Sequence, residues 1–88
     1  MRPAVKVNPV SRVFAKNLRN TLVSMEVSQN KLSRDAGVCL AHLNRVLSGK
    51  NNVGLEYAVR IASTLEVDIR ELLKGSEEAL ELSEGYYE

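Results

Sequence analysis

The stretch from Gln29 to Gly49 constrains the fold of this chain more than any other part of the sequence. Gly37 separates two short segments that each carry apolar residues at helical spacing, and Gly49 follows the second segment. A glycine after such a segment readily takes the left-handed conformation that ends a helix. The stretch therefore predicts two short helices, over about 29–36 and 40–48, joined by a tight turn.

The apolar residues of these two segments are placed to face each other across the turn. Two lie on each expected helix and one lies at the corner between them: Leu32, Ala36, Val38, Leu43 and Val46. The two helices are expected to cross most closely at Ser33, where a small residue is needed. This arrangement is a helix-turn-helix unit, and it needs further helices because it cannot bury both of its faces alone.

A long helix is predicted before this unit. Asn8 and Pro9 have the residue types of a helix cap and of a first helical position, and an apolar face recurs every four residues after them. That face consists of Val10, Phe14, Leu18 and Leu22, with Val13 and Met25 alongside. A second face carries Arg12, Lys16 and Arg19, and it is either a phosphate-facing stripe or a solvated surface.

Two more helices are predicted after the unit. The segment from 55 to 65 is apolar at Leu55, Ala58, Val59, Ile61, Ala62 and Leu65. So wide an apolar surface predicts a central, well-buried helix. Asp68 and Glu71 have capping-box spacing and start a fifth helix, which Gly75 ends. Residues 76–87 are either a short sixth helix capped by Ser76 or a frayed tail. No strand pattern of useful length is present, so the expected fold class is all-α.

Charge is divided unevenly along the chain. Residues 1–50 carry nine basic and two acidic side chains, a net charge of +7, whereas residues 51–88 carry three and nine, a net charge of −6. This asymmetry favours a face that binds a polyanion, joined to an acidic tail. The expected organisation is a basic N-terminal arm over 1–8, a helical domain over 9–74 with its helix-turn-helix unit at 29–49, and an acidic tail or short helix over 75–88.

The residue patterns that enzymes and metal sites need are missing from the sequence. The chain of 88 residues is one small domain, and its single cysteine and single histidine, Cys39 and His42, leave no ligand set for structural zinc. Without a nucleophile elbow or a glycine-rich phosphate loop, neither an enzyme nor a cofactor is expected. The sequence also lacks an apolar run of membrane-spanning length and a signal-peptide core, so a cytoplasmic protein without a membrane partner is expected.

Several short motifs between residues 10 and 74 occur in a fixed order. They are Val27-Ser28-Gln29, Lys31-Leu32-Ser33, Ala36-Gly37-Val38, Leu43, Leu47-Ser48-Gly49-Lys50, Ile61-Ala62-Ser63-Thr64-Leu65 and Val67-Asp68-Ile69-Arg70-Glu71-Leu72-Leu73. With this order and spacing the chain resembles the Cro/CI-type, lambda-repressor-like family of helix-turn-helix regulators. It departs from the family pattern at Ser33, where Ala is usual, at Val53, where Pro is frequent, and over 39–41, where most DNA-binding members have polar residues.

The resemblance implies a compact five-helix domain that binds double-stranded DNA, with its third helix in the major groove. The family positions that face DNA on this helix are Cys39, Leu40, Ala41, His42, Asn44 and Arg45. The positions expected to contact the DNA backbone are Gln29, Lys31, Arg34, Lys50, Asn51 and Asn52. The resemblance therefore implies a small transcriptional regulator.

The side chains of the third helix agree in part with this role. Arg45 can bond guanine with two hydrogen bonds, Asn44 can bond adenine, and Leu40 or Ala41 can pack on a thymine methyl group. His42 is expected to face DNA rather than bind a metal, with a plain surface residue as the alternative. Cys39 is expected to be a small residue at the exit of the turn, with a redox-sensing thiol as the alternative.

Three functions from different classes follow. The first is a repressor of phage, prophage or plasmid type, which binds a near-palindromic operator as a homodimer through a surface around 69–82. The second is an antitoxin that uses the same domain for autoregulation and another segment to bind a toxin protein. The third is a protein-interaction module that has lost DNA binding. The first is preferred, because only residues 1–8 and 75–88 are spare for a toxin. Such a repressor is expected at the nucleoid when it is bound to DNA.

Overall fold

The computed structural model describes residues 6–82, and within them it is all-α, as predicted. The helices are α1 (Pro9–Met25), α2 (Gln29–Ala36), α3 (Leu40–Leu47), α4 (Leu55–Leu65), α5 (Ile69–Leu73) and α6 (Ser76–Leu82). Residues 76–82 are thus helical, the first of the two alternatives for that segment. The expected cap is wrong, because Ser76 is the first residue of α6 and its Oγ donates to the Leu73 carbonyl at 2.6 Å. Most of the expected basic arm and the last residues of the acidic tail lie outside the described residues.

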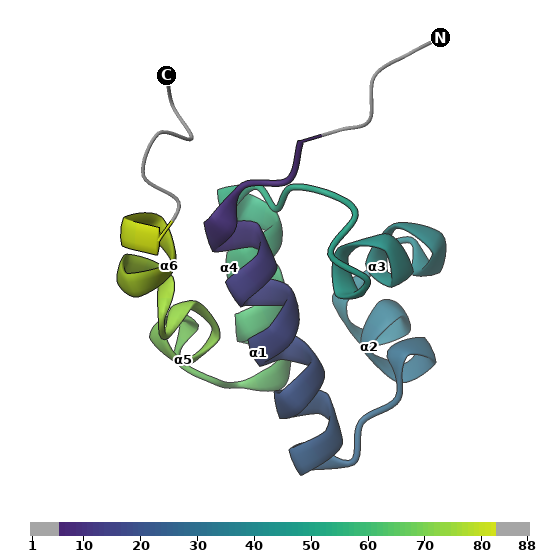
Figure 1. The fold of residues 1–88 in the computed structure, drawn as a ribbon. Helices are drawn as coiled ribbons and strands as arrows, with labels where there is room; N and C mark the ends of the chain where they lie inside the picture. The colour runs from purple at the N-terminus through teal and green to yellow at the C-terminus, as the bar shows by residue number, and fades with distance from the viewer. Residues whose placement is uncertain (1–5, 83–88) are drawn as a thin grey trace, which may run out of the picture.

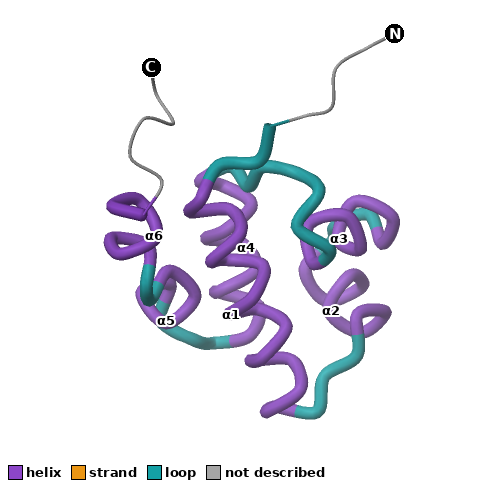
Figure 2. Tube along the Cα trace, in the orientation of Figure 1, coloured by secondary structure: helices purple, strands orange, loops and turns teal. Residues whose placement is uncertain are grey.

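The helices are arranged around α1, which crosses in front of α4 in Figure 1. The pair α2 and α3 lies on one side of α1, and the pair α5 and α6 lies on the other (Figures 1 and 2). Helix α1 contacts α3, α5 and α6, while α4 contacts α2 and α5. The helix-turn-helix unit is therefore supported by α1 and α4. No helix in the described part of the chain is both long and apolar enough to cross a membrane.

Polar side chains fix where three of the helices begin. The Asn8 side chain accepts a hydrogen bond from the backbone N–H of Ser11 at 2.7 Å, and Ser28 Oγ accepts one from Lys31 N at 3.0 Å. Asp68 caps α5 by accepting from Arg70 N at 2.9 Å. The side chain of Arg70 also bonds this carboxylate, and together these bonds hold the Asp68 pKa at about 2. The predicted caps of α1, α2 and α5 are confirmed.

Four helices end in one hydrogen-bonding pattern. At the end of each of α1, α2, α3 and α4, one backbone N–H donates to the carbonyl of the residue five positions earlier in the chain. The N–H of the residue just before it donates to the carbonyl three positions earlier than that residue. This pattern requires a left-handed residue at its centre. That residue is Gly37 (φ 68°) or Gly49 (φ 72°) in the helix-turn-helix unit, as predicted, but Glu26 or Glu66 (both φ 57°) after α1 and α4.

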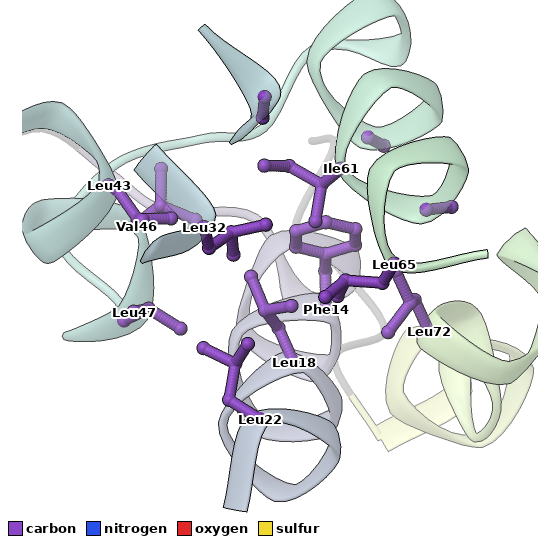
Figure 3. Close-up of a cluster of buried hydrophobic side chains, with 13 residues drawn as sticks. Phe14, Leu18, Leu22, Leu32, Leu43, Val46, Leu47, Ile61, Leu65 and Leu72 are labelled. Atoms are coloured by element: carbon purple, nitrogen blue, oxygen red, sulfur yellow. The ribbon is translucent and has the colours of Figure 1, made fainter. Parts of the chain in front are cut away.

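The core forms where α1 meets the helix-turn-helix unit on one side and α4 and α5 on the other (Figure 3). Its largest fully buried side chains are Phe14, Leu18, Leu32, Leu43, Val46, Ile61 and Leu72. The four residues predicted to face each other across the turn, Leu32, Ala36, Leu43 and Val46, are all buried. Val38 is partly buried against this cluster, as expected for the corner residue.

The prediction that α4 is buried around most of its surface is wrong. Leu55 is 87% exposed and Val59 is 52% exposed. The reason is geometric, because α4 is covered on its Ala58, Ile61, Ala62 and Leu65 face but not on the side that carries Leu55 and Val59. Met25, expected alongside the apolar face of α1, is also exposed, because it lies in the last turn of that helix.

Candidate DNA-binding surface

Burial of one face of α3 leaves the opposite face open. Leu43, Val46 and Leu47 are buried and attach α3 to the core. Because an α-helix turns by about 100° per residue, the residues between them point outward. Ala41, Asn44 and Arg45 are exposed, and Leu40 is 37% exposed on the side toward α2. The structure thus leaves the predicted DNA-facing residues of α3 accessible.

Ser33 of α2 bonds the turn that leads to α3. Its hydroxyl donates a hydrogen bond to the backbone carbonyl of Val38 at 2.6 Å, across the turn. Ser33 is only partly buried, so the small residue expected at this crossing is present and has a polar partner. The departure from the family's usual Ala therefore adds a bond between α2 and the turn that leads to α3.

Arg19 of α1 holds the other end of α3, and this role was missed by the sequence reasoning. Its Nη1 atom donates to the carbonyl of Leu47, the last residue of α3, at 2.5 Å. A cation at this end also complements the helix dipole. Arg12 and Lys16, predicted to share a face with Arg19, instead line a groove with Ala79 and Leu82 of α6. No sequence pattern distinguished Arg19 from Arg12 and Lys16, so this contact had no signal in the sequence.

His42 is held at the flank of α3 by two residues from other segments. Asn51 Nδ2 lies 3.4 Å from His42 Nδ1, and the ring of Tyr57 meets the imidazole edge to face, with centroids 5.0 Å apart. Burial raises the pKa of Tyr57, and the negative charge of the Cys39 thiolate adds to that increase. Tyr57 comes from α4, and no sequence pattern pointed to it.

Asn52, also predicted to contact DNA, bonds to the chain that leads into α1. Its Oδ1 accepts from Asn8 N at 2.7 Å and its Nδ2 donates to the Lys6 carbonyl at 3.2 Å. Next to it, Val53 N donates to Ser11 Oγ at 2.8 Å. The loop after α3 is therefore anchored to the start of α1, which fixes the position of Asn51.

Cys39 stands at the N-cap of α3 and is exposed. The backbone N–H of His42, and then that of Ala41, lower the pKa of its thiol, and the positive charge of Arg45 acts in the same direction. The thiol makes no capping hydrogen bond at ordinary distance. Cys39 thus lies at the exit of the turn, as expected.

The basic side chains near α3 differ in their partners. Lys31 forms an exposed ion pair with Asp35 at 2.8 Å, which is a weak interaction that a phosphate can replace. Within residues 6–82, no ion pair engages Arg34, Arg45 or Lys50. In contrast, Arg60 and Arg70 are paired with carboxylates of their own elements, Glu56 and Asp68. Three cations without a carboxylate partner among the described residues, Arg34, Arg45 and Lys50, therefore lie in or next to the helix-turn-helix unit.

Comparisons with known proteins agree with this geometry. A family model for the helix-turn-helix matches residues 16–72. The chain is similar to the solved structure of the restriction-modification controller protein C.AhdI from Aeromonas hydrophila, with 28% identity and a TM-score of 0.65 over 73% of this chain and 94% of that one. It is also similar to the hypothetical transcription factor NHTF from Neisseria, with 27% identity and a TM-score of 0.71 over 93% and 97%. No curated protein matches the chain.

The family match spans both helices of the unit and the helices that support it, from the middle of α1 to the end of α5. It agrees with the residues that carry the resemblance and with the exposed face of α3. The protein belongs to the Cro/CI-type helix-turn-helix family of DNA-binding transcriptional regulators.

Proposed function

We propose that this protein is a repressor of phage, prophage or plasmid type that binds a near-palindromic operator as a homodimer. One observation carries the proposal: the open face of α3 lies beside Arg34, Arg45 and Lys50, whose charges no carboxylate of the described residues pairs with. Such a surface attracts phosphate from any sequence, while side chains on α3 reach base edges.

The residues of α3 have different roles in the proposal. Arg45 bonds guanine with two hydrogen bonds. Asn44 lies on the flank of α3 opposite His42 and bonds adenine. Leu40 and Ala41 pack on thymine methyl groups at the start of α3, next to Cys39. The residues that contact the DNA backbone are Gln29, Lys31, Arg34, Lys50, Asn51 and Asn52.

A dimer is proposed because one unit of this size reads too little DNA. A single small module buries about 600–1,000 Å² on DNA, whereas two units on half-sites one helical turn apart double the contact. The exposed apolar surface favours a contact face that includes α4 as well as α5. Leu55 projects beside a cavity of about 160 Å³, lined mainly by Val10, Phe14, Val53, Ala58, Ile69 and Leu73. A projecting side chain next to an apolar hollow on one face suits a two-fold contact between identical copies.

Selection of bound duplexes from a random DNA pool tests the proposal. The full-length protein should enrich one near-palindromic sequence whose half-sites lie about one helical turn apart. Arg45→Ala in a parallel selection should enrich a less defined sequence. Recovery of duplexes without a common sequence, or of a single half-site, would contradict the proposal.

A second candidate function, control of a restriction-modification system, is favoured by the similarity to C.AhdI. Both candidates use the same surface and the same dimer. The selected sequence distinguishes them by its location in the source genome, because a controller's site lies at restriction and modification genes, whereas a repressor's site lies at phage or plasmid genes.

A further inference from the structure

His42 differs from the other residues that α3 offers to DNA, because it is half-buried and held from two sides. Asn51 approaches its Nδ1 atom at 3.4 Å, and the Tyr57 ring lies at 82° to the imidazole plane. The Tyr57 hydroxyl is buried without a hydrogen-bond partner in the described part of the chain, so Tyr57 restrains the imidazole through its ring alone.

The chemistry of an amide fixes what Nδ1 does in this contact. In the orientation of the Asn51 amide that the structure shows, Nδ2 donates and Nδ1 of His42 accepts. A neutral imidazole that accepts at one nitrogen carries its proton on the other. Nε2, the nitrogen that Asn51 does not engage, is therefore a donor.

The contact is built into the fold rather than left to a loose side chain. On one side of Asn51, Lys50 N donates to the Arg45 carbonyl at 3.0 Å and closes the end of α3. On the other side, Asn52 and Val53 bond the residues that start α1. Asn51 is thus held between two anchored segments, opposite the flank of α3 that carries Asn44.

We propose that Asn51 is a positioning residue that holds His42 in the tautomer with its proton on Nε2, so that His42 presents one hydrogen-bond donor to the major groove. This proposal rests on the DNA-binding function proposed above and names a specificity determinant within it. In the major groove, guanine offers two acceptors, thymine and adenine offer one each, and cytosine offers only a donor. His42 therefore favours guanine and excludes cytosine at the base it meets.

The tautomer is tested on the free protein, without DNA. Nitrogen-15 NMR of the neutral imidazole should show the proton on Nε2. Asn51→Ala should give a mixture of the two tautomers, whereas Asn44→Ala, which changes the other flank of α3, should leave the wild-type signal unchanged. A proton on Nδ1 in the unchanged protein, or an unchanged tautomer in Asn51→Ala, overturns the proposal.

The readout is tested by repeating the DNA selection with His42→Gln and Asn51→Ala. A glutamine amide both donates and accepts, so His42→Gln should admit cytosine at one position and lower affinity for the original site about five- to tenfold. Asn51→Ala should relax the same position, while the guanine read by Arg45 stays selected. The proposal is overturned if both variants still bind the original site and keep the wild-type base preference at every position. If the unchanged protein selects no sequence, the proposed function fails, and the readout fails with it.

Discussion

At the scale of single residues, Ser33 shows how a departure from a family pattern can be structural. Its hydroxyl bridges the turn to the Val38 carbonyl at 2.6 Å, a bond that the usual alanine cannot make. An intramolecular hydrogen bond of this kind contributes about 1 kcal/mol, and loss of the donor leaves a partly buried carbonyl without its partner.

Ser33→Ala is therefore expected to lower the free energy of unfolding by about 1 kcal/mol, although it restores the family's usual residue. Urea denaturation monitored by circular dichroism measures the change. Ser63→Ala, at an exposed position on α4, is the matched control and should change stability little. Equal stability of Ser33→Ala and the control would show that the bond contributes nothing.

Arg45 and Lys50 are expected to differ in what they contribute to binding. Arg45→Ala should cost about 1–3 kcal/mol at the selected sequence and much less on unrelated DNA, because it removes contacts to a base. Lys50→Ala should weaken both kinds of DNA alike and reduce the dependence of binding on salt, because it removes a phosphate contact. Fluorescence anisotropy across a salt series distinguishes the two. Equal losses on both DNAs for Arg45→Ala would make Arg45 a phosphate contact.

At the scale of helices, the ends of α1 and α4 carry strain that the ends of α2 and α3 do not. Glu26 and Glu66 take the left-handed conformation (φ 57°) that Gly37 and Gly49 take in the helix-turn-helix unit. A side chain with a Cβ atom is disfavoured there by about 1 kcal/mol or more, because the Cβ crowds the following carbonyl. The valines that follow, such as Val67, pack against the core and hold these turns in place.

Opposite substitutions at these ends should therefore have opposite effects. Glu66→Gly is expected to raise the free energy of unfolding by about 0.5–1 kcal/mol, and Gly37→Ala to lower it by about 1 kcal/mol or more. An added Cβ at Gly37 meets no neighbouring atom within 4 Å, so its cost comes from the backbone conformation alone. Thermal unfolding of the two variants measures both changes. A stability loss in Glu66→Gly would mean that the Glu66 side chain has a stabilising role.

At the scale of the whole molecule, the face that carries Leu55 is expected to decide the oligomeric state. Leu55→Glu should weaken dimerisation about tenfold or more, because a two-fold contact places two like charges together. The substitution should not harm the fold, since Leu55 is exposed and a carboxylate suits the first turn of a helix. Analytical ultracentrifugation measures the shift. Val23→Glu, at an exposed valine on α1 outside residues 69–82, is the control that should remain dimeric.

The acidic charges of α6 should have little effect on DNA binding at physiological salt. Helix α6 lies on the side of the molecule away from α3 (Figure 1), and the described part of the chain spans 38 × 33 × 21 Å. The screening length at physiological salt is about 8 Å. Neutralising Glu77, Glu78 and Glu81 with glutamine should therefore raise affinity only at low salt, where screening is weak. A large gain at physiological salt would place these carboxylates close to bound DNA.

The sequence alone was sufficient for α1 to α5, because local chemistry specifies these helices, but it left residues 76–87 open between a helix and a tail. Side-chain caps at Asn8 and Ser28 and glycines at 37 and 49 fix helix ends through neighbouring backbone groups, and apolar periodicity fixes which face is buried. The same local information placed the exposed residues of α3 as candidates for DNA contact.

Tertiary structure alone decided what meets α3 from distant parts of the chain. Arg19 bonds the last carbonyl of α3, Tyr57 restrains His42, and Leu55 is left exposed on a helix with apolar residues around much of its surface. None of these has a local signal, since each depends on which helices lie side by side after packing. The sequence does not distinguish a buried apolar residue from an exposed one, because burial depends on the whole arrangement of helices rather than on the residue itself.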